Sequence, residues 1–321
     1  MFLAHSGVQL SKAMSMIPAI KTTTRRTIMT THSFGESSTY ILPTKKNEHL
    51  LVRKWNASGA PKGVIIAIHG GMAHSGDWHL PAHFYNKKGY ELHAIDLPGH
   101  GTYAELNLGK KNLLDIETFD VYVERVHDLV KSVQKKSPSL PIYIFAHSMG
   151  GLIALLYGLS LGKNQKCIRG FGISAPWLKN KTKSPIPAFM VRLLARFLPT
   201  LSVPLKIDLS HLTHDQEVLR RHQMDIDSGL RGGSATPRFA IVSQQAQDKL
   251  ELELSNWKEY PLAVAIAGMD YLADPQFTKT QMERIQSPII KYRFYQNNLH
   301  ENFNEINRQE VFQYIFDSLK M

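Results

Sequence analysis

The sequence predicts an α/β fold in which a mostly parallel central sheet is covered by helices on both faces. Three observations lead to this prediction: short, nearly continuous apolar segments, helical segments with one apolar side between them, and polar or glycine-containing turns directly after the apolar segments. Strands that are apolar throughout are typical of parallel sheets, which are buried on both faces. In such sheets functional groups gather at the carboxyl ends of the strands. The residues that directly follow each apolar segment are therefore the candidates for function.

The expected strands are short and are distributed over most of the chain. They are Val64–Ile68, Tyr90–Ile95, Ile142–Ala146, Ile168–Ile173, Leu262–Ala267 and Ile289–Tyr295. Between the second and third of them, the segment Leu114–Val133 places its apolar residues on one side at helical spacing, which predicts an amphipathic helix.

Length and composition are those of one large folded domain. The chain has 321 residues, of which 43% are hydrophobic and 20% charged, and these values exclude a disordered or collagenous chain. Cys167 is the single cysteine, so no internal disulfide can form and a thiolate metal site gains no support. The formal net charge of +11 favours anionic partners such as acidic lipid headgroups. Because no nucleic-acid recognition motif accompanies the basic residues, we expect no nucleic-acid partner.

Residues 1–35 differ from the rest of the chain, since they contain four basic residues and no acidic one. No basic residue precedes Lys12 and no apolar run of about seven residues is present, so a secretory signal is not expected. We expect either a flexible N-terminal extension or a start codon placed too early, with Met14, Met16 or Met29 as the true start. A targeting segment is the alternative interpretation.

The longest uncharged stretch, Ser137–Gly162, has the length needed to cross a bilayer, which is roughly 20 apolar residues. It is divided by the turn-forming residues 147–151, which indicates a strand, a tight turn and a helix instead. We therefore expect no transmembrane segment, and a cytoplasmic protein that associates with membranes at most peripherally.

Residues 177–235 break the alternation of strands and helices, and we expect them to form a cap inserted into a core of residues 36–176 and 236–321. An apolar stripe at helical spacing runs through this cap, formed by Ile186, Phe189, Met190, Leu193, Leu194 and Phe197. From Trp177 to Ile207 every charged residue is basic, namely Lys179, Lys181, Lys183, Arg192, Arg196 and Lys206. In one interpretation the stripe docks on the body of the protein, and in the other the basic amphipathic helix lies on an anionic membrane surface.

Residues 146–151, Ala-His-Ser-Met-Gly-Gly, follow an expected strand and begin an apolar helix. This pattern is typical of a nucleophile elbow, a sharp turn that exposes a serine between small residues. Ala146 stands where a glycine is usual, which is a mild departure from that pattern. Ser148 is the predicted nucleophile.

A serine hydroxyl needs a base to accept its proton and an acid to orient that base. When these groups stand on a nucleophile-elbow sheet, their order along the chain is serine, acid, histidine. Of the histidines that follow His147, three lie in the expected cap, namely His211, His214 and His222. His300, just past the final expected strand, is therefore the predicted base.

The predicted acid is Asp270, which leaves the strand Leu262–Ala267 directly. Asp274 is the alternative, although it fits better as a helix cap. An acyl-transfer reaction also needs donors for the oxyanion that develops. The backbone N–H groups of Gly71, after the first expected strand, and of Met149, after the nucleophile, are the predicted oxyanion hole.

With these motifs the chain resembles the monoacylglycerol lipase and lysophospholipase branch of the α/β-hydrolases. The matching segments are residues 69–76, 96–101, 147–151, 267–270 and 299–301 and, in the cap, 209–215. The resemblance implies an α/β-hydrolase fold, a cap over an acyl-binding tunnel, chemistry through an acyl-enzyme, and no metal or organic cofactor. Ala146, the N-terminal extension and residues 223–237 depart from the family pattern and leave the substrate open.

Together, the residues and the resemblance predict a serine ester hydrolase that releases fatty acid from single-chain lipids, either monoacylglycerols or lysophospholipids. The residues expected to bind the acyl chain are Phe189, Met190, Leu193, Leu194 and Phe197 of the cap stripe. The alternatives are a carboxylesterase for small soluble esters and a non-catalytic binding protein on the same fold. A dehalogenase or an epoxide hydrolase would carry a carboxylate in place of Ser148. No oligomeric state is predicted.

Overall fold

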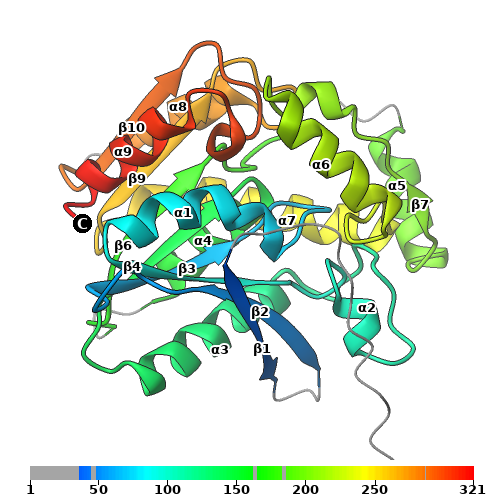
Figure 1. The fold of residues 1–321 in the computed structure, drawn as a ribbon. Coiled ribbons are helices and arrows are strands. Elements are labelled where there is room, and N and C mark those ends of the chain that lie inside the picture. Colours follow the sequence, from blue (N-terminus) through cyan, green and yellow to red (C-terminus); the bar gives the residue numbers. More distant parts are fainter. Residues whose placement is uncertain (1–35, 45–47, 162–164, 183–185, 286) are drawn as a thin grey trace, which may run out of the picture. The chain divides into compact units, whose positions relative to one another are not determined.

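The computed structural model describes residues 36–44, 48–161, 165–182, 186–285 and 287–321. Its centre is a sheet with the strand order β1-β2-β4-β3-β5-β6-β9-β10 (Figure 1). The strands of this sheet are β1 (Ser37–Pro43), β2 (His49–Trp55), β3 (Gly63–Ile68), β4 (Tyr90–Ile95), β5 (Ile142–His147), β6 (Ile168–Ser174), β9 (Leu262–Ala267) and β10 (Ile290–Tyr295). The neighbours from β4 to β10 run parallel, whereas β1 and β2 are antiparallel additions at one edge.

All six strands expected from the sequence are present, with ends that agree to one residue. The two antiparallel strands, β1 and β2, were not predicted. In β1 only Leu42 is buried, and β2 contains the charged residues Arg53 and Lys54, so neither strand has the continuous apolar character of a strand buried on both faces. Their place at the sheet edge depends on pairing, of β2 with β4 and of β1 with β2, rather than on their own hydrophobicity.

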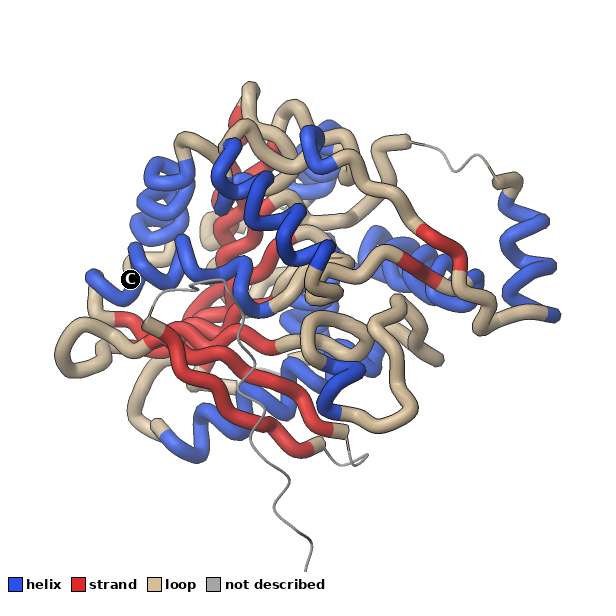
Figure 2. The backbone as a smooth tube through the Cα atoms, turned by 45° about the vertical axis from the view of Figure 1, so that its right-hand side comes forward, coloured by secondary structure: helices blue, strands red, loops and turns tan. Residues whose placement is uncertain are grey.

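Helices cover both faces of the sheet, as the sequence predicts (Figures 1 and 2). On one face lie α3 (Asp120–Lys136) and α4 (Met149–Ser160), and on the other lie α1 (His79–Lys87) and α9 (Arg308–Ser318). The alternation along β3 illustrates the division, because Val64, Ile66 and Ile68 pack under α3 and α4 while Ile65 and Ala67 pack under α1 and α9. The smaller elements of the core are η1 (Ser75–Trp78), α2 (Tyr103–Leu106), η3 (Leu254–Asn256), α8 (Pro275–Arg284) and η4 (Asn302–Asn304).

The helix expected from Leu114 begins only at Asp120 in the structure. Leu114 instead pairs with Ala235 in an isolated bridge, and its backbone N–H donates to the carbonyl of Ser234 over 3.1 Å. The expectation was therefore wrong for the first turn and a half. Leu114 instead contacts Ser234 and Ala235 at the end of the cap. Helical spacing in the sequence does not reveal a tertiary contact of this kind.

The segment between β6 and β9 adds elements that do not belong to the sheet, and we keep the name cap for residues 177–235. The cap contains α5 (Ala188–Phe197), β7 (Val203–Pro204), η2 (Leu209–His211), α6 (Gln216–Asp227) and β8 (Ser234–Ala235). The chain then returns to the core through α7 (Pro237–Glu253), which begins at the N-cap residue Thr236. The predicted N-terminal extension, residues 1–35, lies outside the described residues.

Asp96, directly after β4, braces the loops at the carboxyl ends of two neighbouring strands. Its carboxylate accepts hydrogen bonds from the backbone N–H of Ser75 (2.7 Å) and of Thr102 (3.1 Å). The approach is so close that a Cβ on Gly101, whose φ is +55°, would lie 2.3 Å from an Asp96 oxygen. Only glycine fits this position, and the brace fixes the loop edge on which the predicted site lies.

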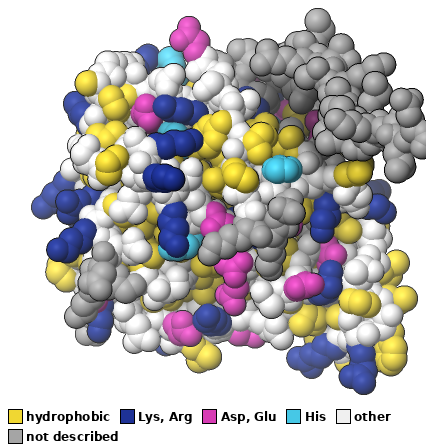
Figure 3. All heavy atoms as spheres, turned by 90° about the horizontal axis from the view of Figure 1, so that it is seen from below, with side chains coloured by type: hydrophobic (Ala, Val, Ile, Leu, Met, Phe, Trp, Pro, Cys, Tyr) yellow, Lys and Arg dark blue, Asp and Glu magenta, His cyan; other side chains and the backbone are white. Residues whose placement is uncertain are grey.

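Within the described ranges, we find no helix with the length and apolar character needed to cross a bilayer. On the face of the molecule shown in Figure 3, Lys and Arg side chains are spread among Asp and Glu side chains rather than gathered in one patch. The positive net charge is therefore not concentrated on this face.

Candidate active site

Ser148 stands in a sharp turn between β5 and α4. Its backbone has φ 53° and ψ −118°, a conformation that residues other than glycine rarely adopt. The turn is held from both sides, because the Ser148 N–H donates to the carbonyl of Ser174 (3.0 Å) and the Ser148 carbonyl accepts from the N–H of Trp177 (3.0 Å). The geometry is that of the nucleophile elbow expected from the sequence.

The small residues around Ser148 allow α4 to start close to the sheet. A Cβ on Gly150 would lie 2.3 Å from the carbonyl oxygen of Ile68, so that a larger residue would push the helix away from β3. Ala146, the departure from the usual pattern, is fully buried in β5 and is paired in register with Ile68 and Ile173. Its extra methyl group is thus part of the core.

Asp270 and His300 lie against each other at the carboxyl ends of β9 and β10. The Asp270 Oδ2 is 2.7 Å from the His300 Nδ1, and both side chains are buried. The other carboxylate oxygen, Oδ1, accepts from the backbone N–H groups of Leu272 (2.7 Å) and Ala273 (2.9 Å). Because Nδ1 faces a carboxylate, the ring proton resides there and Nε2 keeps its lone pair, the arrangement that a general base requires.

The charge of Asp270 also affects the basicity of the imidazole. Burial alone would lower the pKa of His300, but the Asp270 carboxylate, through its charge and its hydrogen bond, and the charge of Glu301 outweigh burial and raise this pKa above 6.5. The neighbouring His147, whose ring centroid is 4.7 Å from that of His300, differs: burial and the nearby His300 lower its pKa to about 4. His147 is therefore neutral near neutral pH.

Asp274, the alternative acid, has a different role in the structure. It is the N-cap residue of α8, and its Oδ1 accepts from the backbone N–H groups of Gln276 and Phe277, each over 3.0 Å. This is the arrangement expected of a helix cap.

One pocket of about 260 Å³ brings together four of the five residues predicted for the chemistry. Ser148, His300, Gly71 and Met149 all line it, while Asp270 supports His300 from behind. Most of the remaining wall is apolar and comes from both core and cap: Met72, Leu114, Trp177, Leu205, Ile207, Leu212, Phe239 and Leu272. Two charged residues, Arg231 and Glu301, also line the wall.

The structure does not bring the predicted cap stripe to this pocket. None of Phe189, Met190, Leu193, Leu194 and Phe197 lines it, and α5 packs against α7 with its apolar side facing outward, Phe189 being 67% and Phe197 68% exposed. Figure 2 shows this helix at the outer edge of the cap. The cap residues that do line the pocket, such as Leu205, Ile207 and Leu212, lie in short extended or irregular segments, where no periodic pattern marks them in the sequence.

A cluster of His74, Asp77 and Asp225 is the one group in the described ranges that has the composition of a metal site. The hydrogen bonds do not fit a metal, because His74 Nδ1 accepts from the Gly76 N–H (3.1 Å). Its Nε2 therefore carries the proton, 3.1 Å from Asp225 Oδ2, so that the ring has no lone pair left for a cation. Asp77 is in turn paired with Arg231 at 2.7 Å. We therefore interpret the cluster as a network of polar groups rather than as a metal site.

The chain is similar to one protein family and to several known lipases. A protein family described as "Serine aminopeptidase, S33" matches residues 59–307. The chain is 26% identical to the monoacylglycerol lipase of Mycolicibacterium smegmatis over 263 residues, which cover 80% of this chain and 88% of that protein. It is 25% identical to phospholipase YtpA of Bacillus subtilis over 81% of this chain and 95% of that protein.

A longer relative and a solved structure complete the comparison. An uncharacterized abhydrolase domain-containing protein of Dictyostelium discoideum is 26% identical over 88% of this chain, but the match spans only 29% of that protein. A soluble variant of the Saccharomyces cerevisiae monoglyceride lipase superposes with a TM-score of 0.72 at 19% identity, covering 88% of this chain and 94% of that one. The structural likeness confirms the predicted α/β-hydrolase fold.

Because Asp270 contacts His300 and Asp274 caps α8, substitution of the two residues should have different effects on the reactivity of Ser148. Asp270→Asn should slow the reaction of Ser148 with a serine-directed phosphonate on the order of 10⁴-fold, because the imidazole loses the partner that holds its proton on Nδ1. Asp274→Asn should stay within about threefold of wild type, because asparagine is also a good N-cap. Labelling rates measured by intact-protein mass spectrometry check both variants, and the reverse pattern would make Asp274 the acid.

Proposed function

Because the chain belongs to the family described as "Serine aminopeptidase, S33", we propose that it is a serine ester hydrolase that releases fatty acid from single-chain lipids. The observation that carries the proposal is the buried Asp270–His300 pair, 2.7 Å apart, next to a largely apolar pocket that both His300 and Ser148 line. The strained backbone at Ser148 supports it as well, since strain of this kind is typical of functional sites.

In the proposed mechanism the Ser148 Oγ attacks the ester carbonyl carbon while the His300 Nε2 takes the hydroxyl proton. The backbone N–H groups of Gly71 and Met149 stabilise the negative charge on the carbonyl oxygen. As the bond to the alcohol breaks, His300 gives the proton to the leaving oxygen, and the acyl group remains on Ser148. A water molecule, deprotonated by His300, then attacks this ester, and His300 returns the proton to the Ser148 oxygen as the bond to the acyl group breaks and the fatty acid leaves. Asp270 stabilises the imidazolium in both steps.

The walls of the pocket support an acyl chain as the bound group. They offer mostly apolar side chains from the core and the cap, and burial of apolar surface stabilises a bound hydrocarbon chain by about 0.8 kcal/mol for each methylene. The relatives support the same substrate class, since one is named a monoacylglycerol lipase and another a phospholipase. We therefore propose a monoacylglycerol or a lysophospholipid as the substrate.

The exposed side of α5 supports a peripheral contact with lipid. Phe189, Leu193 and Phe197 are exposed there, and Arg192 and Arg196 lie on the same short helix. Apolar side chains flanked by basic ones are typical of helices that lie in a membrane interface. We propose that α5, which does not line the pocket, brings the enzyme to a surface that holds its substrate.

The release of fatty acid from 1-oleoylglycerol and from oleoyl lysophosphatidylcholine tests the proposed activity. Wild type should release oleate from at least one of them, and Ser148→Ala should lower this rate by at least about 10⁴-fold because no nucleophile remains. A folded wild type that hydrolyses only short soluble esters would be a carboxylesterase. One that hydrolyses neither kind and is not labelled by the phosphonate would be a binding protein.

Sedimentation with vesicles that contain phosphatidylserine tests the membrane contact. Phe189→Ser combined with Phe197→Ser should weaken binding at least about tenfold, because the apolar surface that enters the interface is lost. Lys179→Gln combined with Lys181→Gln should also weaken it, and more so at low salt, where charge attraction is less screened. Leu252→Ser removes an equally exposed apolar side chain from α7 and should bind as wild type. Binding that none of these changes affects would argue against the contact.

A further inference from the structure

A chain of buried polar contacts joins the cap to the residue that follows His300. The Glu301 Oε2 accepts hydrogen bonds from His222 Nε2 of α6 (2.9 Å) and from Asn304 Nδ2 (2.7 Å). The backbone N–H of Glu301 donates to the carbonyl of Leu212 in the cap over 2.8 Å. Glu301 is thus held by the cap through both its side chain and its main chain.

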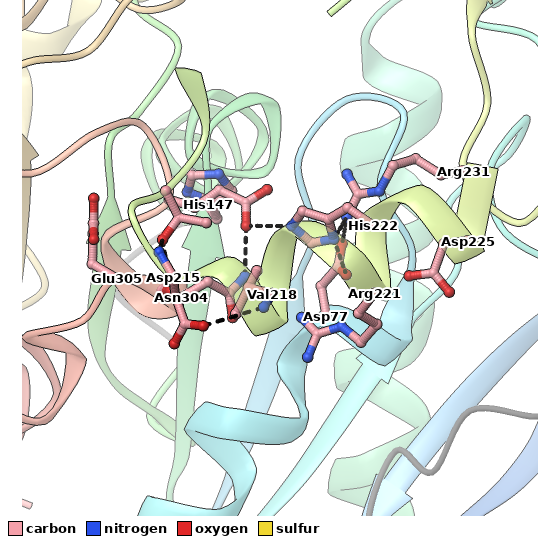
Figure 4. A network of polar contacts seen from close by, with 12 residues as sticks. Asp77, His147, Asp215, Val218, Arg221, His222, Asp225, Arg231, Asn304 and Glu305 are labelled. Carbon is pink, nitrogen blue, oxygen red and sulfur yellow. Dashed lines mark hydrogen bonds and ion pairs between the residues drawn. The ribbon is translucent and has the colours of Figure 1, made fainter. Parts of the chain in front are cut away.

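The contacts of Arg231 fix the tautomer of His222. The Arg231 guanidinium lies 2.8 Å from His222 Nδ1 and 2.7 Å from an Asp77 carboxylate oxygen (Figure 4). A guanidinium group only donates hydrogen bonds, so Nδ1 must hold a lone pair and the ring proton must be on Nε2. His222 is therefore neutral and donates to Glu301. The hydrogen bonds run in one direction, from Arg231 through His222 to Glu301.

The two carboxylates of this network, Glu301 and Asp77, are both charged. Burial would raise the pKa of Glu301, but the hydrogen bond from His222 and the charge of Arg231 hold it far below its ordinary value. Burial would likewise raise the pKa of Asp77, whereas the charge of Arg231 keeps it low. Glu301 is thus a carboxylate throughout the neutral range, and its charge lies beside the catalytic imidazole.

Three titratable groups from different elements face His300. They are Asp270 after β9, Glu301 on its own loop, and His147 at the end of β5. His147 is neutral near pH 7, so two negative charges act on the imidazole. Asp270 makes the direct hydrogen bond, while Glu301 adds a second favourable charge for the imidazolium form.

We propose that Glu301 and His222 are positioning residues for His300, through which the docked cap helix α6 holds the catalytic base in place and stabilises its protonated form. The inference rests on the proposed function and goes beyond it. It assigns to α6 a role in the chemical step, whereas the proposed function uses the cap only for lipid binding. In this role both residues act through His300.

Other ion pairs cross the same interface without reaching His300, and one of them supplies a control. Arg308 of α9 contacts Asp215 at the start of α6 over 2.7 Å. Arg308→Met removes a polar link between cap and core, as His222→Leu does, but it leaves Glu301 and its partners in place. A purely structural network would respond to both substitutions alike.

The experiment uses the full chain and 4-nitrophenyl butyrate, an ester that is soluble and needs no lipid surface. His222→Leu should lower kcat by about tenfold or more with little change in KM, as expected for the loss of a hydrogen bond to a charged group. His222→Gln, whose amide still donates to Glu301 and accepts from Arg231, should stay within about threefold of wild type. Arg308→Met should retain wild-type kcat, and melting temperatures show that each variant is folded.

The pH profile separates positioning from stability. His300 must be neutral to accept the proton, so kcat/KM falls below its pKa. Glu301→Gln removes the second negative charge, lowers the pKa of His300, and should move the acid limb of the profile to lower pH. An unmoved limb, or equal losses in His222→Leu and Arg308→Met, would overturn the inference while Ser148-dependent hydrolysis stands. A wild type that neither hydrolyses the ester nor reacts with the phosphonate would overturn the proposed function and the inference together.

Discussion

The strained turn at Ser148 is the constraint on which the site depends. A positive φ at a residue with a side chain is unfavourable, and it persists only where the surrounding structure holds it. Here the sheet does so through the Ser174 carbonyl, and α4 does so by starting where Gly150 passes close to β3. The parallel strands then bring Asp270 and His300 to the same edge, because their carboxyl ends all lie there. The rigidity of the core thus aligns the proposed triad.

Much of this arrangement was predictable from the sequence, for a physical reason. A strand buried on both faces must be apolar throughout, so β3, β4, β5, β6, β9 and β10 are visible as short apolar runs. The turns that follow them carry Ser148, Asp270 and His300, and the chain order of these residues limits the choice of partners. The sequence also favoured Asp270 over Asp274 as the acid, because Asp274 lies where it can cap the helix that follows, α8.

What escaped prediction depends on tertiary contacts. The edge strands β1 and β2 are only partly apolar; β2 forms by pairing with β4, and β1 by pairing with β2. The apolar spacing of α5 predicts the helix correctly, but spacing does not say what the helix faces, and its side chains point away from the pocket. The chain Asp77, Arg231, His222 and Glu301 joins residues that are up to 224 positions apart, counting from residue 77 to residue 301, so no local pattern links them. The contacts that the cap makes with the site were therefore the part of the structure that the sequence predicted least well.

In the proposed enzyme the Ser148 turn aims its hydroxyl group at a carbonyl whose oxygen lies against the N–H groups of Gly71 and Met149. A crystal structure of the protein after reaction with a long-chain alkyl phosphonate tests this arrangement. We expect phosphorus bonded to the Ser148 Oγ and a phosphonyl oxygen about 3 Å from both backbone nitrogens, with the alkyl chain in the apolar pocket. Phosphorus on another residue, or an oxygen turned away from both nitrogens, would contradict it.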